Sequence, residues 1–305
     1  MEFQKIGLVG MGACGAAYAA GLWKAYGTDF RLIAAGDRAR RLSRGVSVNG
    51  DLIRPDLAAK GWLADLVLFS TKNYDLESAL EDARPYIGPH TVLLPTLNGI
   101  TATAVLAKAF PQNQVLYGVD MGIDALRTAA GVTVTKPPYL VFGADPALAQ
   151  SPAVPAVKTV LDRAGLPNAI SENMLVSLWR KWMWNMGFNQ VTAALDATYG
   201  DVAAIPEIYE LAERAMFEVY AMAQYLDIPL STDDILVKRH AYDHAAPFGK
   251  TSMAQDLAAG RRTEVDYFSG LLLTMAQEAN QLCPVNHALY LLIKAKEQQN
   301  ARKQN

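Results

Sequence analysis

The sequence has little cysteine, no long apolar run and no excess of charge of either sign, and each absence removes a class of protein. The only cysteines are Cys14 and Cys283, so a disulfide framework is excluded and a reducing compartment is expected. No apolar run approaches the roughly 20 residues that span a bilayer. The 28 basic and 30 acidic side chains leave a net charge of −2, which gives no electrostatic reason to bind nucleic acid.

Apolar residues, in contrast, are plentiful. Hydrophobic residues make up 51% of the 305 positions, which is enough for a sizeable core and too many for a disordered chain. This length corresponds to about two domains. The first residues lead directly into the apolar segment Ile6–Val9 without the features of a secretory signal. We therefore expect a cytoplasmic, two-domain protein with no membrane partner.

The first half alternates between strand and helix patterns. The strand patterns are short β-branched and apolar runs: Lys5–Gly10, Phe30–Ala35, Leu66–Thr71, Thr91–Leu97, Val115–Asp120 and Tyr139–Gly143. The helical patterns between them are Ala13–Tyr26, Asp75–Ile87 and Ile100–Phe110. This alternation predicts an α/β domain with a doubly wound sheet over residues 1–168. The segment Val46–Ile53 further predicts a hairpin that turns at Asn49-Gly50.

The second half shows little strand signal. Its helical patterns are Ser171–Leu195, Pro206–Asp227, Ser231–His244, Ser252–Asn280 and Pro284–Gln299. Together they predict an all-α domain over residues 169–305, beginning after the break at Gly165–Ile170. His240 and His244 are four residues apart, but the carboxylate and third ligand of a zinc site are missing, so no metal is expected.

A glycine motif stands between the first predicted strand and helix. Gly10-Met11-Gly12-Ala13-Cys14-Gly15 matches G-x-G-x-x-G in the context that this motif requires. The first glycine permits a tight turn, the second lets the backbone approach a pyrophosphate, and the third lets helix and strand pack closely. The phosphates would lie at the helix N-terminus. The alternative is a tight turn without a ligand, and the context favours the dinucleotide site.

Which dinucleotide the motif binds stays open from these residues. Asp37, just after the second predicted strand, favours NAD because a carboxylate there binds a ribose 2′-hydroxyl. Arg38, Arg40 and Arg41 favour NADP because they can meet a 2′-phosphate. The same arginines are also ordinary on the exposed face of a helix.

Lys72 and Asn98 follow the next two predicted strands. They lie where the carboxyl ends of strands bind ligands in open α/β sheets. A lysine there can meet the negative charge of a cofactor, and an asparagine amide can bond a ribose or nicotinamide. Taken alone, each residue is ordinary loop polarity.

In the second half, Lys181, Asn185 and Asn189 follow one another at intervals of four and form a polar stripe on one predicted helix. Tryptophan, methionine and phenylalanine occupy its other sides, so the helix is expected to be buried. A buried ammonium and buried amides need hydrogen-bond partners, which a ligand or a polar cleft can provide. The alternative is a stripe that faces solvent.

Two later residues, Ser252 and Glu264, are further candidates for the site. Ser252 with Gln255 fits a capping box, so Ser252 is expected to be a helix N-cap. A hydroxyl at that place can also hold a substrate carboxylate. Glu264 is either a carboxylate of the site or a solvated partner for Arg261 or another basic residue.

The order of these motifs, ending in Ser252-Met253-x-Gln255-Asp256 and Arg262-Thr263-Glu264-x-Asp266-Tyr267, resembles the ketopantoate reductase family over nearly the whole chain. The resemblance implies a Rossmann-like domain joined to an all-helical domain, with the active site in the cleft between. It also implies reduction of ketopantoate to pantoate with NADPH, and Lys181 as the general acid. By the same resemblance, substrate binding falls to Asn185, Asn189 and Ser252. Cofactor binding falls to Gly10–Gly15, Lys72 and Asn98, and Glu264 lies at the cleft.

Two departures from the family pattern keep alternatives open. Ala35 stands where members often carry an arginine, so NADP binding depends on Arg38 as a substitute and NAD is not excluded. The segment Val119–Asp124 lacks the usual threonine-rich stretch, which fits a relative that acts on another 2-keto acid. A dinucleotide-binding protein without turnover is a third alternative, although such a protein needs no general acid. The sequence sets no oligomeric state, and a homodimer stays open.

Overall fold

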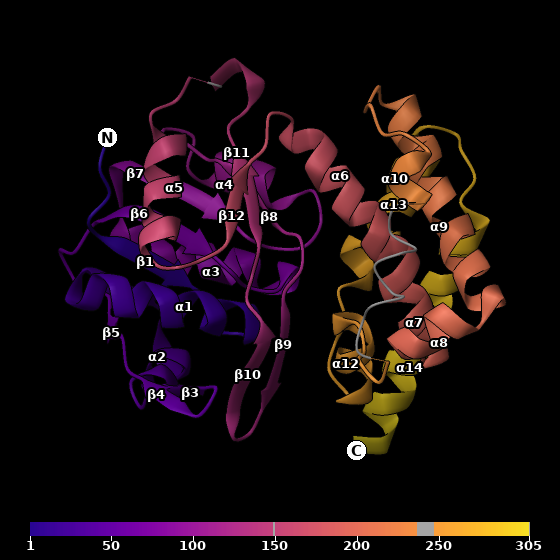
Figure 1. Ribbon diagram of the computed structural model, residues 1–305, viewed down its shortest axis with the longest axis horizontal. Coiled ribbons are helices and arrows are strands. Elements are labelled where there is room, and N and C mark those ends of the chain that lie inside the picture. The colour runs from indigo at the N-terminus through magenta and orange to yellow at the C-terminus, as the bar shows by residue number, and fades with distance from the viewer. Residues whose placement is uncertain (149, 237–246, 305) are drawn as a thin grey trace. The chain divides into compact units, whose positions relative to one another are not determined.

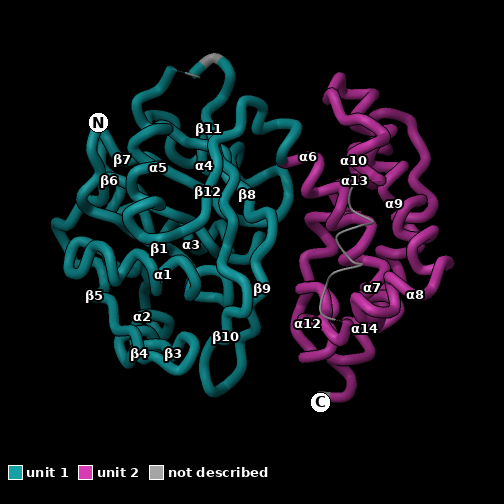
Figure 2. The backbone as a smooth tube through the Cα atoms, in the orientation of Figure 1, with its two compact units in different colours: residues 1–177 teal, residues 178–305 magenta. Residues whose placement is uncertain are grey.

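The computed structural model describes residues 1–148, 150–236 and 247–304. The chain forms two compact units, residues 1–177 and residues 178–305 (Figure 2). The division falls inside helix α6 (Met174–Trp184), after the strand β12 (Asn168–Ile170). In the described part, no helix combines the length and the apolar content needed to cross a bilayer.

Unit 1 is built on a five-stranded parallel sheet with the order β5-β2-β1-β6-β7. Figure 1 labels four of these strands, β1, β5, β6 and β7. Its strands are β1 (Ile6–Val9), β2 (Phe30–Ile33), β5 (Asp56–Leu57), β6 (Ala64–Phe69) and β7 (Ile87–Pro95). Its helices are α1 (Ala13–Tyr26), α2 (Gly36–Leu42), α3 (Leu76–Ala83), α4 (Ala102–Ala109) and α5 (Ala153–Arg163). The Rossmann-like domain predicted from the sequence is confirmed.

Successive side chains along each strand point to opposite faces of the sheet and enter different hydrophobic clusters. Ile6 and Leu8 of β1 pack with α1 and α5 in one cluster. Val9 of the same strand packs with α3 and α4 in another cluster. Both faces of the sheet are therefore covered by helices, as the near-continuous apolar strands require.

Two of the predicted strands lie outside this sheet. β8 (Tyr117–Asp120) and β11 (Leu140–Gly143) pair antiparallel and form a smaller sheet with β12. Their connection contains no helix, which explains the antiparallel pairing. The connection is itself a hairpin, β9 (Asp124–Thr128) and β10 (Gly131–Lys136), which the sequence analysis missed.

The hairpin predicted at Val46–Ile53 is confirmed. It consists of β3 (Val46–Val48) and β4 (Asp51–Ile53), with positive φ at Asn49 and Gly50 as its tight turn requires. β10 pairs with β3, so the two hairpins together form a four-stranded sheet.

Unit 2 is helical, as predicted. Besides the end of α6 it contains α7 (Gln190–Leu195), α8 (Tyr199–Ala204), α9 (Pro206–Tyr225), α10 (Asp233–Leu236), α12 (Ser252–Ala258), α13 (Ser269–Glu278) and α14 (Pro284–Gln304). The helix predicted over Ser231–His244 is described only as α10, and His240 and His244 lie outside the described residues.

The single helix predicted over Ser252–Asn280 is wrong. α12 ends at Ala258, where Gly260 adopts a left-handed φ of 65° and the Arg261 N–H donates to the Asp256 carbonyl. This is a common way for a glycine to end a helix. The chain resumes an α-helix only at α13, and the intervening segment carries Glu264 and a short 3-10 turn at Val265–Tyr267.

Candidate active site

The glycine motif forms the turn between β1 and α1, and two of its glycines are required by the fold. Gly10 has a φ of 96°, and a Cβ there would lie 2.5 Å from the Ser70 carbonyl oxygen. A Cβ at Gly15 would lie 2.0 Å from the Gly10 carbonyl oxygen. The first glycine therefore makes the turn and the third permits helix–strand contact, as the motif predicts.

Gly12 differs, because nothing in the described part of the fold requires a glycine there. Its φ is −68°, and a Cβ would meet no atom of the described residues within 4 Å. Gly12 is the N-cap of α1 without a side-chain cap, and the first turn carries no acidic residue. Open space beside uncapped N–H groups fits a pyrophosphate, because such N–H groups bind anions.

The loops after β6 and β7 lie beside this turn. A Cβ on Gly10 would contact Ser70 and Thr71, which immediately precede Lys72. The Asn73 amide donates to the Asn98 carbonyl over 2.9 Å. The strands β1, β6 and β7 are neighbours in the sheet, so their carboxyl ends bring the glycine turn, Lys72 and Asn98 to one edge.

A buried hydrogen bond holds the helix that follows the glycine turn. The Tyr18 hydroxyl of α1 donates to the Asp120 carboxylate at the end of β8, and both side chains are buried. Burial raises the pKa of Tyr18 well above its usual value, and the Asp120 charge raises it further. Tyr18 therefore stays protonated as a donor and fixes α1 against β8.

The basic cluster after β2 is partly neutralised by neighbouring carboxylates. Arg40 forms an ion pair with Asp37 on the exposed surface of α2. Arg38 lies 3.8 Å from Asp82 of α3, and its side chain is 35% exposed. Arg38 is thus near the end of β2 but already has an acidic neighbour.

A groove of about 600 Å³ lies elsewhere in unit 1, between α1 and the β3–β4 hairpin. Its lining includes Ala20, Trp23 and Lys24 from the second half of α1. The glycine turn is at the other end of that helix, so the groove is not the dinucleotide site.

In unit 2, the polar stripe lies on a deeply packed helix. Trp182, Met183 and Met186 are fully buried. Asn185 is only 4% exposed, whereas Lys181 and Asn189 are partly exposed. The solvent-facing alternative is wrong for Asn185, and the stripe runs from a buried amide to accessible polar ends.

The helix changes its winding along the stripe, which the sequence analysis missed. Residues Asn185–Asn189 form a π-helical turn between α6 and α7. Gly187 lies against α9, where a Cβ would be 2.7 Å from the Ala212 carbonyl oxygen. Such single π turns often occur at functional sites, and this one shifts Asn189 relative to the regular four-residue spacing.

A buried pair of hydroxyls connects the π turn to α12. Thr192 donates to the Phe188 carbonyl over 2.7 Å, and its oxygen lies 2.7 Å from the Thr251 hydroxyl. Since Thr192 has one hydroxyl hydrogen, Thr251 is the donor between them. Thr251 in turn accepts from the Ala254 N–H and caps α12.

The N-cap prediction for Ser252 is therefore wrong. Thr251 is the N-cap, and Ser252 is the first residue of α12. Gln255 does not complete a capping box, because its amide donates to the Lys250 carbonyl. The Ser252 hydroxyl accepts instead from the Asn189 amide over 3.4 Å, which brings together two of the predicted substrate ligands.

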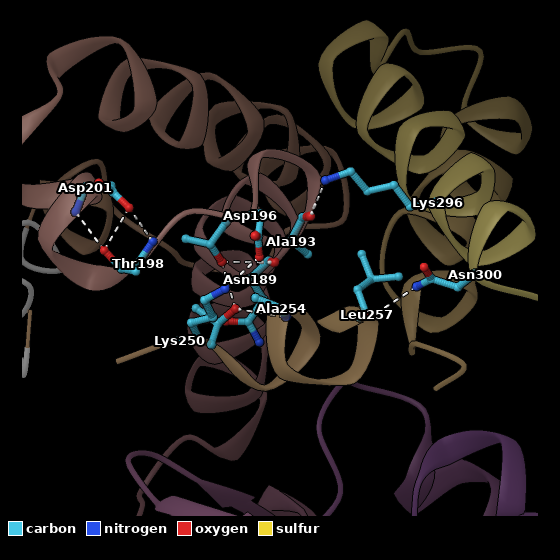
Figure 3. A network of polar contacts seen from close by, with 12 residues as sticks. Asn189, Ala193, Asp196, Thr198, Asp201, Lys250, Ala254, Leu257, Lys296 and Asn300 are labelled. Carbon is cyan, nitrogen blue, oxygen red and sulfur yellow. Dashed lines mark hydrogen bonds and ion pairs between the residues drawn. The ribbon is translucent and has the colours of Figure 1, made fainter. Parts of the chain in front are cut away.

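Helix α14 is hydrogen-bonded to α7, which directly follows the π turn that ends at Asn189, and to α12, which begins at Ser252 (Figure 3). Lys296 donates to the Ala193 carbonyl of α7, and Asn300 donates to the Leu257 carbonyl of α12. Lys250 also pairs with Asp196 at the end of α7 over 2.7 Å. The position of Asn189 against Ser252 is thus fixed by surrounding polar contacts.

Glu264 is 5% exposed, and Arg261 pairs with Asp256 instead. The alternative in which Glu264 is a solvated partner of Arg261 or of another basic residue is therefore wrong, because the Glu264 side chain is buried. The preceding Thr263 is anchored to Glu297 of α14 by its N–H and its hydroxyl, each over 2.7 Å. Its segment is joined to α6 because the Trp182 indole donates to the Tyr267 carbonyl over 3.3 Å. Lys181 is next to Trp182, and Glu264 is three residues before Tyr267. The two residues therefore lie on segments that are hydrogen-bonded to each other.

Both units match one protein family. The family described as ketopantoate reductase PanE/ApbA matches residues 6–146, and its C-terminal part matches residues 173–297. The chain belongs to the ketopantoate reductase family. The prediction of this family from the motifs is confirmed, and the chain is an oxidoreductase of the NAD(P)-dependent type that this family contains.

The individual relatives and solved structures are distant in sequence. The 2-dehydropantoate 2-reductase of Pyrococcus horikoshii is 26% identical over 96% of this chain and 98% of its own. D-mandelate dehydrogenase, solved with NADH and anilino(oxo)acetate, has a TM-score of 0.87 at 22% identity, covering 97% and 99%. A dimeric ketopantoate reductase from Staphylococcus aureus has a TM-score of 0.82 at 17% identity, also covering 97% and 99%. The structural likenesses confirm the shared fold.

Proposed function

We propose that this reductase converts ketopantoate to pantoate with NADPH, as in pantothenate biosynthesis. The observation that carries the proposal is the combination of Lys181 and Asn185 on one buried helix with Asn189 bonded to Ser252. These side chains provide a cation and neutral donors, which suit a ketone and a carboxylate. The glycine turn provides the matching site for a dinucleotide pyrophosphate.

The chemistry assigns a separate task to each group. When bound, the reduced nicotinamide supplies a hydride to the ketone carbon. The ketone oxygen then gains negative charge, which the Lys181 ammonium stabilises before it donates a proton to that oxygen. Asn185, Asn189 and Ser252 donate to the substrate oxygens and orient them. Glu264 either orients the ammonium or accepts from a substrate hydroxyl.

A second candidate function is the reduction of another 2-keto acid with NADH. Ala35 in place of an arginine and the Arg38–Asp82 pair favour it, because they weaken the case for a 2′-phosphate site. The fold is also shared with a D-mandelate dehydrogenase solved with NADH. This alternative retains the same roles for Lys181 and the amides.

The experiment that separates these functions measures kcat/KM for ketopantoate, a small aliphatic 2-keto acid and an aromatic 2-keto acid, each with NADPH and NADH. We expect the highest value for ketopantoate with NADPH. A higher value for another keto acid would replace the proposed substrate, and equal or better use of NADH would replace the proposed cofactor.

We expect Arg38→Ala to raise the KM for NADPH about tenfold, the loss typical of one hydrogen bond to a charged group. The KM for NADH should hardly change, because NADH has no 2′-phosphate. Asp82→Asn is the matching variant, since removing the neighbouring negative charge should lower the KM for NADPH. If steady-state kinetics show equal effects on both cofactors, Arg38 does not read the 2′-phosphate.

Asn189→Ala is expected to weaken substrate binding by about 1–3 kcal/mol, because a ligand oxygen loses its donor. The KM for the keto acid should rise while the dissociation constant for NADPH stays unchanged. Gln298→Ala, which removes an exposed amide from α14, serves as the control. Unchanged kinetics in Asn189→Ala would assign the stripe a purely structural role.

We also propose that the reductase is a homodimer. The support is the dimeric state named for the Staphylococcus aureus relative of the same fold. Light scattering at several protein concentrations should give twice the mass of the 33.1 kDa chain. A monomer mass throughout would refute the dimer and leave the proposed reaction untouched.

A further inference from the structure

An arginine from the second hairpin reaches the glycine turn. Arg127 lies on β9, which belongs to the four-stranded sheet rather than to the parallel sheet. Its Nη1 donates to the carbonyl oxygen of Met11, the residue between the first two glycines of the motif. Arg127 is far from this turn in sequence, so only the fold brings the two together.

Among the described residues, the charge of this arginine is not neutralised by a carboxylate. The side chain is exposed, and no carboxylate within the described ranges forms an ion pair with Arg127. The first turn of α1 also lacks an acidic residue. A guanidinium has five N–H donors in a planar fork, so the bond to Met11 leaves donors for a second group.

We propose that Arg127 binds the pyrophosphate of the dinucleotide, an inference that rests on the proposed use of a nicotinamide cofactor. The bond to Met11 positions the guanidinium next to Gly12, where the backbone leaves open space. In the motif this second glycine is the point of approach to the pyrophosphate. Guanidinium groups suit phosphate oxygens because they bind them in a bidentate manner.

The 2′-phosphate at the adenosine end of the cofactor fits the position of Arg127 less well than the pyrophosphate does. A 2′-phosphate is expected after the second strand, where Asp37 and Arg38 lie. Arg127 contacts the turn after the first strand instead. Arg127 is therefore a ligand for the part that NADPH and NADH share, whereas Arg38 is the candidate for the part in which they differ.

The test is fluorescence titration of NADPH and of NADH with the full-length Arg127→Ala variant, without substrate. We expect both dissociation constants to rise about tenfold or more, as for a lost hydrogen bond to an ionised group. Arg127→Lys should recover part of the loss, since it restores a point charge without the fork. Arg84→Ala is the control, because Arg84 is an exposed arginine of unit 1 paired with Glu81.

The outcomes separate this inference from the function on which it rests. If Arg127→Ala retains wild-type dissociation constants for both cofactors, the assignment is overturned. If only NADPH binding weakens, Arg127 contacts the 2′-phosphate and the pyrophosphate assignment is overturned. If the wild-type protein binds neither cofactor, the proposed function fails first. Thermal melting of each variant checks that the fold is retained, as expected for an exposed side chain.

Discussion

Replacing Lys181 by alanine should lower kcat by about 10²–10⁴, the usual contribution of a positioned general acid. Hydride addition leaves negative charge on the ketone oxygen, and the Lys181 ammonium is the cation of the polar stripe. Without it, the developing charge must be stabilised and protonated from water. Steady-state kinetics at saturating substrate measure the loss directly.

The variant should still bind NADPH, because the glycine turn belongs to the other compact unit. Fluorescence titration is expected to give a dissociation constant within a few-fold of the wild-type value. Lys158→Ala is the matched control, since Lys158 is an exposed lysine of unit 1 paired with Asp162. Lys181→Arg keeps the charge, but a guanidinium is a much weaker acid than an ammonium, so it should recover little of the rate. A folded Lys181→Ala protein with nearly normal kcat would reduce Lys181 to a structural residue.

The second large effect is expected at Gly12. A valine there should weaken the binding of both NADPH and NADH by about 100-fold or more, because its branched side chain fills the space that a pyrophosphate needs. The protein itself should tolerate the change. The backbone of Gly12 has a negative φ, and a Cβ there meets no atom within 4 Å.

The contrast with Gly15 makes this prediction specific to the ligand. Gly15→Ala places a Cβ 2.0 Å from the Gly10 carbonyl oxygen, so it should lower the melting temperature as well as cofactor binding. Gly12→Val should leave the melting temperature of the cofactor-free protein near the wild-type value. If Gly12→Val binds NADPH normally, the turn is not a pyrophosphate site. If it melts early, Gly12 has a structural role that the structure does not show.

The parts of the site that the sequence predicts depend on local patterns. The glycine turn follows from contacts between residues close in the chain, such as Gly15 against Gly10. The burial of α6 follows from its tryptophans and methionines. The parallel sheet follows from strand–helix alternation, which leaves few other arrangements.

The missed features depend on contacts between distant residues. The π turn arises where Gly187 meets α9, and no local pattern marks it. Thr251 replaces Ser252 as the cap because it also bonds to Thr192. Arg127 reaches Met11 through a strand that pairs in a separate sheet. The alternating run Val132–Thr135 was a signal for that hairpin, but nothing local connects it to the glycine turn.

The proposed reaction of this chain is the reduction of the ketone of a 2-keto acid with hydride from a nicotinamide cofactor. The most direct test incubates the purified wild-type protein with ketopantoate and NADPH, and quantifies pantoate and oxidised cofactor over time. We expect one pantoate for each NADPH oxidised. It would be contradicted by a protein that binds NADPH but oxidises none of it with ketopantoate or with any other 2-keto acid of the panel.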